Sequence, residues 1–213
     1  MKFRIAALLA VSVLGGCRTP GDLTDENGGG VFAVRSPCPI AGVPAGTGDI
    51  TLFNAAGSTD SRAIDVTATI TDVRATCQTA GNDVVSTATF SIVALRGDPG
   101  PARQVVLPYF DVVLQGGTRV VAKRVGQAVI NFAPGDSRGW ARVQAGARVN
   151  RSAATLPANV REILTRRRKP GETEAALDPL SDPAVRQAVA NATFEHLVGF
   201  QMSPDQLRYN ATR

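Results

Sequence analysis

The sequence of 213 residues is poor in histidine, lysine and aromatic residues. His196 is the only histidine and Trp140 the only tryptophan, and there are three cysteines. So few nitrogen and sulfur ligands do not make an ordinary zinc site, and we expect neither a metal nor a cofactor. Catalytic motifs are also scarce: the chain has no G-x-S-x-G nucleophile elbow and no glycine-rich loop ahead of a predicted helix.

Long hydrophobic runs are lacking as well. The longest lies at the N-terminus, where two cations precede the apolar run Ile5–Leu14. Its ten residues are too few for a membrane-spanning helix, which needs about 20. A basic start, a short apolar run and a small-residue site ending in Cys17 are typical of a secretory signal.

The end of this signal, Leu14-Gly15-Gly16-Cys17, resembles the lipobox of bacterial lipoproteins. The resemblance implies cleavage after residue 16 and lipidation of Cys17; an ordinary cleaved signal peptide is the alternative. Two or three acyl chains hold a protein on a membrane without a transmembrane segment. Because Arg18 follows the cysteine where inner-membrane members of this class often carry Asp, the resemblance favours the outer membrane of the cell envelope.

Cleavage would leave residues 17–213 and lower the net charge from +5 to +3. Only three of the 23 cations are lysines, so the high isoelectric point reflects arginine usage. An exported protein also meets little nucleic acid, and we therefore predict no nucleic-acid partner. The expected partners are the membrane, through the N-terminal lipid, and a protein of the envelope.

Lipidation of Cys17 would leave two cysteines, Cys38 and Cys77. In an oxidising compartment an isolated pair indicates a disulfide, although two buried thiols remain an alternative. The bond would close a loop of roughly 40 residues and contribute about 4 kcal/mol in the chain-entropy model.

The middle of the chain is expected to be a β domain, residues 31–152, joined to the lipid by a flexible tether, residues 17–30. Apolar residues alternate with Asp and Thr in Arg62–Thr71, and a change of phase near Thr71-Asp72 predicts a bulge. A second alternating stripe follows the turn residues 78–83, so the two strands are expected to form a hairpin. Further strands are predicted, separated by turn signals, at 31–35, 49–54, 104–114, 119–132 and 140–149.

About seven short strands predict an antiparallel immunoglobulin-like or fibronectin-like β-sandwich. The hallmark order of immunoglobulin domains is not met, because Trp140 follows both cysteines instead of lying between them. We expect Phe110 and Trp140 in the core; the alternative is a carbohydrate platform that includes them and Tyr109.

The remainder, residues 153–213, is expected to be a helical appendage packed on the sandwich. A short helix is predicted within 157–169. A longer helix is predicted from a cap at Asp182 through an apolar stripe that reaches Phe200, with His196 at its boundary or surface.

The strongest electrostatic feature is the basic run Arg166, Arg167, Arg168 and Lys169. It could contact anionic lipid or an acidic partner. The simpler interpretation is a solvated helix end, where cations also interact favourably with the helix dipole.

Candidate catalytic groups are weak. A Ser-His-Asp site would need His196, and the carboxylates Asp65 and Asp72 could serve a glycosidase only if they met in a cleft. The sequence therefore predicts a lipid-anchored binding or scaffolding module that is not catalytic. One alternative is an accessory subunit of a secretion or surface-appendage complex whose edge strand accepts a partner strand; the other is an envelope hydrolase.

Overall fold

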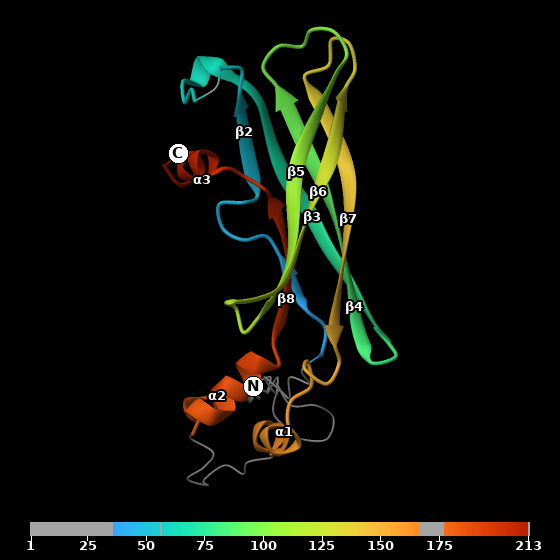
Figure 1. Ribbon diagram of the computed structural model, residues 1–213, viewed down its shortest axis with the longest axis vertical. Helices are drawn as coiled ribbons and strands as arrows, with labels where there is room; N and C mark the ends of the chain where they lie inside the picture. The colour runs from blue at the N-terminus through green and yellow to red at the C-terminus, as the bar shows by residue number, and fades with distance from the viewer. Residues whose placement is uncertain (1–35, 56, 167–176, 213) are drawn as a thin grey trace, which may run out of the picture. The chain divides into compact units, whose positions relative to one another are not determined.

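The computed structural model describes residues 36–55, 57–166 and 177–212. These residues form two four-stranded sheets, which we call sheet A, in the order β1-β8-β5-β6, and sheet B, in the order β2-β3-β4-β7 (Figure 1). The strands of sheet A are β1 (Ile40–Gly42), β8 (Phe194–Phe200), β5 (Arg103–Gln115) and β6 (Arg119–Phe132). Those of sheet B are β2 (Asp49–Phe53), β3 (Ile64–Ala80), β4 (Asp83–Arg96) and β7 (Arg138–Asn150).

All strand pairs are antiparallel except β1 with β8, which is parallel. The helical segments are short: η1 (Ser61–Ala63), α1 (Ala158–Thr165), η3 (Pro179–Ser181), α2 (Pro183–Asn191) and α3 (Pro204–Thr212). Figure 1 shows α1 and α2 near one end of the sheets and α3 beside β2. The mainly β architecture predicted from the alternating stripes is confirmed.

The β3–β4 hairpin follows directly from its sequence. Buried and partly exposed residues alternate along the whole of β4. A two-residue turn joins the strands, and Gly81 supplies the positive φ of 61° that this turn requires. The predicted bulge is also present, because the β3–β4 register shifts between Thr71 and Arg74 and Asp72 takes a φ of 51°.

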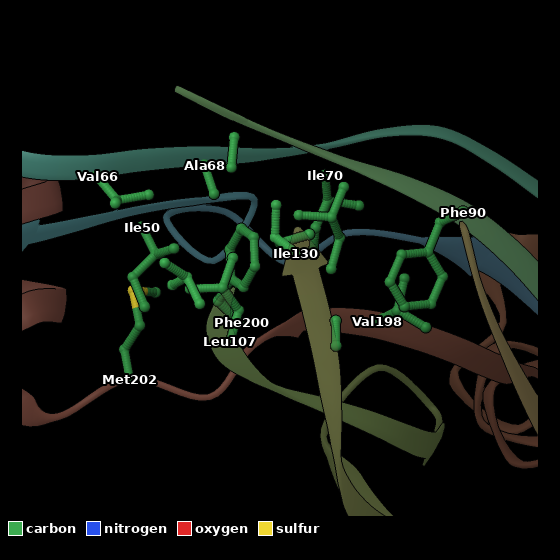
Figure 2. Packing of buried hydrophobic residues seen from close by; sticks show 14 of the residues in the cluster. Ile50, Val66, Ala68, Ile70, Phe90, Leu107, Ile130, Val198, Phe200 and Met202 are labelled. Atoms are coloured by element: carbon green, nitrogen blue, oxygen red, sulfur yellow. The ribbon is translucent and has the colours of Figure 1, made fainter. Parts of the chain in front are cut away.

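The two sheets share one core of buried apolar side chains. Ile50, Val66, Ala68, Ile70 and Phe90 contribute from sheet B, and Figure 2 shows them facing residues of sheet A. Those labelled from sheet A are Leu107, Ile130, Val198 and Phe200, with Met202 just beyond β8. A smaller cluster near the other end joins Val113, Ala147, Val149, Ala154 and Phe194. Burial of these side chains, at about 1.5–3 kcal/mol for each large one, is the main force that holds the sheets together.

The predicted disulfide is confirmed. Cys38 and Cys77 are joined by a sulfur–sulfur bond of 2.06 Å, with their Cα atoms 5.9 Å apart. Cys38 lies just before β1 of sheet A and Cys77 lies in β3 of sheet B. The bond therefore ties the start of the short strand β1 to the opposite sheet.

A buried arginine closes the other end of the two sheets. The Arg96 side chain is 5% exposed and lies over the Phe132 ring, 5.2 Å from its centroid. Its guanidinium donates hydrogen bonds of 2.6–3.0 Å to the carbonyls of Gly100, Pro101, Ala133 and Asp136. One side chain thus satisfies backbone acceptors in both turns, the one after β4 and the one after β6.

The expected long C-terminal helix is wrong beyond Asn191. Its start is as predicted, since the Asp182 carboxylate accepts a hydrogen bond from the Ala184 N–H at 2.7 Å. The chain then forms β8, in which Phe194, His196, Val198 and Phe200 are buried at every second position. Because β8 hydrogen-bonds to β1 and β5 on its two sides, a strand buries this stripe in the core more completely than a surface helix would.

Candidate functional site

The outward side of β5 and β6 is rich in exposed valine. In the ladder Val106 pairs with Val129 and Phe110 pairs with Val125, all on the side of sheet A that faces away from the core. The valines are exposed by 45%, 41% and 59%, and Val120 near the hairpin by 59%. We call Val106, Val120, Val125 and Val129 the valine face. Because large contiguous apolar patches are uncommon on monomeric proteins, the valine face is a candidate contact surface.

An aromatic ring and a lysine lie at the centre of the valine face. A Cβ atom added at Gly199 would lie 2.7 Å from the Phe110 ring, so the ring rests on the bare backbone of β8. The Lys123 ammonium lies 5.1 Å from the centroid of the same ring. This cation–π contact places a positive charge among the exposed valines.

Tyr109 points to the other side of β5, where its ring lies against Gly126 and edge-on to Phe90, with centroids 5.6 Å apart. Tyr109 and Phe110 therefore belong to opposite faces of sheet A. Together with the position of Trp140 in sheet B, this is incompatible with the carbohydrate platform considered from sequence.

The first half of β6 is exposed on both of its faces. Every side chain from Arg119 to Val125 is exposed, whereas the inward positions Ala128, Ile130 and Phe132 are buried. Among the described residues β6 pairs only with β5, so its other edge carries backbone N–H and C=O groups without a strand partner. We call Arg119–Val125 the β6 edge segment.

The β6 edge segment is basic. Arg124 pairs with the buried Asp111 at 3.3 Å, and this is the one acidic contact of the segment within the described part of the chain. Arg119 and Lys123 have no carboxylate within ion-pair distance there. The candidate site is therefore an apolar face bordered by a strand edge with a surplus of positive charge.

A serine and the histidine do meet, but they meet inside the molecule. Ser86 Oγ lies 3.1 Å from His196 Nδ1, and both side chains are fully buried. His196 Nε2 has no hydrogen-bond partner within the described residues. Burial lowers the pKa of His196, an effect that the nearby Asp111 charge opposes and the Arg124 charge reinforces. The imidazole is thus held neutral at neutral pH.

This arrangement does not support hydrolysis by a Ser-His-Asp site. The triad geometry places the serine on the imidazole nitrogen opposite to the one that the aspartate orients, with the serine open to substrate. Here Ser86 is sealed between the sheets, so a substrate carbonyl has no path to its hydroxyl. The expectation that His196 lies at a helix boundary or surface is also wrong, since it is an inward residue of β8.

A second surface feature is an open groove of about 1140 Å³ between β2, the loop after it and α3. Phe53 and Tyr209 meet edge-to-face on its wall, with ring centroids 5.2 Å apart. Asp65 and Asp205 also line it, the first in a bidentate ion pair with Arg103 and the second paired with Arg208. Neither Ser86 nor His196 lines this groove, so the buried serine–histidine pair is not part of it.

The two carboxylates considered for a glycosidase do not meet. Asp65 and Asp72 are seven positions apart on β3, which is about 23 Å along a strand. Hydrogen bonding from Arg103 lowers the pKa of Asp65. Asp72 pairs with Arg74 at 3.0 Å and with Arg142 at 3.7 Å. Each carboxylate is thus part of its own structural ion pair.

The expected core position of Trp140 is wrong, because its side chain is 68% exposed on the outer face of sheet B. Along β7 the buried residues are Gly139, Ala145, Ala147 and Val149, all at odd positions. Trp140 shares the opposite side with its arginine and glutamine neighbours. The alternation of β7, rather than the size of the side chain, decides its direction.

Several predicted residues lie outside the described part of the chain. These are Cys17 with the signal and tether, the strand expected at 31–35, and Arg167, Arg168 and Lys169 of the basic run. Arg166 is described and follows the last residue of α1. Across 36–55, 57–166 and 177–212 no cluster of His, Cys, Asp or Glu could hold a metal ion, and no helix is long and apolar enough to cross a bilayer.

Comparisons with protein-family models, with curated proteins and with solved structures gave no match to this chain.

Proposed function

We propose that the protein is a non-catalytic binding module of the cell envelope, anchored by lipid at Cys17, that presents the valine face of sheet A to a protein partner. The observation that carries the proposal is the exposure of Val106, Val125 and Val129 on the outward side of β5 and β6. The sealed Ser86–His196 pair supports binding in preference to catalysis. The anchor and the outer-membrane location rest on the lipobox resemblance and on Arg18.

The finer fold assignment belongs to the same proposal. Two sheets with a shared core and a disulfide between them support a β-sandwich. Immunoglobulin domains order their strands ABED and CFG, which differs from the orders β2-β3-β4-β7 and β1-β8-β5-β6. We therefore propose a sandwich without the immunoglobulin connection of its strands.

Site-specific photo-crosslinking in intact cells tests the proposed binding face. A photoreactive amino acid at Val129 is expected to give a discrete protein adduct. The same amino acid at Gln144, exposed on the outer face of sheet B, serves as the matched control and should give none. Equal adducts at both positions, or none at any position of the valine face, would contradict the proposal.

The anchor is tested separately by labelling cells with radioactive palmitate. Label should enter the protein and be lost in a Cys17→Ala variant, which should also leave the membrane fraction. If the variant stays membrane-bound to the same extent, the anchor at Cys17 is wrong while the binding face remains open to its own test.

A further inference from the structure

The β6 edge segment has the backbone features of a strand that accepts another strand. From Arg119 to Val125 the strand extends beyond the shared core, and neither face is covered. Every second residue turns its N–H and C=O toward the free edge, so donor and acceptor pairs repeat there about every 7 Å. Extended peptides bind such edges through main-chain hydrogen bonds, with side chains on alternate positions giving specificity.

The side chains of the segment define which strand it accepts. Val120, Lys123 and Val125 lie on the valine face, and Arg119 and Arg124 lie on the other side. A partner strand would therefore meet apolar surface and positive charge on one side, and positive charge on the other. Opposite charges on neighbouring strands stabilise their pairing, and like charges destabilise it.

We propose that an extended acidic segment of the partner protein adds to the free edge of β6 along Arg119–Val125, with apolar and acidic side chains at alternate positions. This inference rests on the proposed function, because it assigns the mode of binding and the partner chemistry to the same face. A second copy of this chain fits less well, since pairing two β6 edges would bring six cations together.

Fluorescence anisotropy with a defined peptide tests the inference. The probe is the acetylated, amidated peptide Thr-Val-Glu-Val-Glu-Val-Glu-Thr, labelled at one end, and the comparison peptide carries Lys in place of each Glu. The Glu peptide is expected to bind and the Lys peptide to bind at least tenfold more weakly. In the double variant Arg119→Glu/Lys123→Glu this preference should reverse, because both side chains are exposed and carry the unpaired charge.

Arg138→Glu is the matched control, since Arg138 is an exposed cation on β7 in the other sheet. It should leave the affinity for the Glu peptide within twofold of that of the unchanged protein. Far-ultraviolet circular dichroism of each variant should match that of the unchanged protein, because none of these substitutions touches the core.

Backbone pairing is tested with two further Glu peptides, one N-methylated at its three Val amides and the other at its three Glu amides. Alternate amides of a strand point to the same edge, so one of the two peptides should lose binding. Equal binding of both methylated peptides and the parent would overturn strand addition. Failure of the parent Glu peptide to bind would also overturn the inference. The inference is equally wrong if the protein binds only vesicles of anionic phospholipid, or if it self-associates and the Arg119→Glu/Lys123→Glu variant does not.

Photo-crosslinking separates this inference from the proposed function. If the adduct at Val129 persists unchanged in the Arg119→Glu/Lys123→Glu background, the partner does not pair with the β6 edge, and the proposed function stands without this inference. If no adduct forms even in the unchanged background, the proposed function itself fails. If the adduct forms in the unchanged background and is lost in the Arg119→Glu/Lys123→Glu background, the result supports both the proposed function and this inference.

Discussion

Removal of the Cys38–Cys77 disulfide should destabilise the protein through its unfolded state. The bond joins residues 39 positions apart. In the chain-entropy model a loop of that length restricts the unfolded chain by about 13 cal/mol/K, or about 4 kcal/mol at 25 °C. Because a domain of ordinary stability has only about 5–15 kcal/mol in total, this is a large fraction. The double variant Cys38→Ala/Cys77→Ala should therefore fold but unfold at a clearly lower urea concentration.

The structure adds a local consequence of the same change. Strand β1 has three residues and pairs only with β8 among the described elements, so the disulfide is its main link to sheet B. Amide hydrogen exchange at Ile40–Gly42 should therefore rise more than exchange in the centre of β4, which lies between two strands.

Equilibrium urea unfolding followed by circular dichroism measures the effect. The unchanged protein in reductant is the control, and it should match the double variant. A loss of stability below about 1 kcal/mol would refute the loop-entropy reasoning. Alkylation of Cys38 and Cys77 in the native protein without reductant would refute the bond itself.

Three further predictions follow from buried and exposed single residues. Burial lowers the pKa of His196, so the unfolded chain binds a proton below about pH 6.5 that the folded state excludes. The free energy of unfolding should thus fall with decreasing pH in this range by up to about 1.4 kcal/mol per pH unit. This dependence on pH should become weaker in His196→Gln; an unchanged dependence would show that His196 is not the group responsible. Replacement of Arg96 by Met should cost about 1.5–3 kcal/mol in urea unfolding, because four backbone carbonyls of the two turns lose their charged donor, whereas Arg138→Met should change stability by less than about 0.5 kcal/mol. Trp140, as the only tryptophan and 68% exposed, should show native fluorescence and acrylamide quenching close to those of the urea-unfolded protein, and a strongly blue-shifted native emission would place it in an interface or core.

The parts of the fold that could be predicted are those set by local alternation and turn residues. The stripe in β4, the bulge at Asp72 and the turn at Gly81 each depend on residues close together in sequence. The position of Trp140 could also have been found this way, because Val143, Ala145 and Val149 define the buried side of β7 and Trp140 is out of phase with them.

The end of the C-terminal helix was harder to predict. Asp182 shows where α2 begins, but the apolar residues from Val185 to Phe200 fit helical spacing nearly as well as strand spacing. What makes Phe194–Phe200 a strand is the neighbouring β5, about 80 residues away in sequence, with which it pairs. The candidate site likewise depends on how strands that lie far apart in the sequence pair with one another. The turn signals on both sides of 119–132 predict a strand, but only the strand order shows that β6 lies at an edge.

The middle parts of the two outer faces differ, and this difference favours a binding role for the β6 side of the molecule. On sheet B the middle of β4 presents Thr87, Thr89 and Ser91 outward. Among the described residues, the exposed large apolar side chains of that face lie only toward one end, at Leu95 and Trp140. On sheet A the corresponding positions of β6 carry Val125 and Val129. Both faces belong to one chain of the same composition, so composition alone does not explain the difference. An exposed strand edge would also pair with unrelated strands and with other copies of the chain. The cations at the β6 edge discourage both kinds of pairing, and an acidic strand is the partner that such an edge can accept.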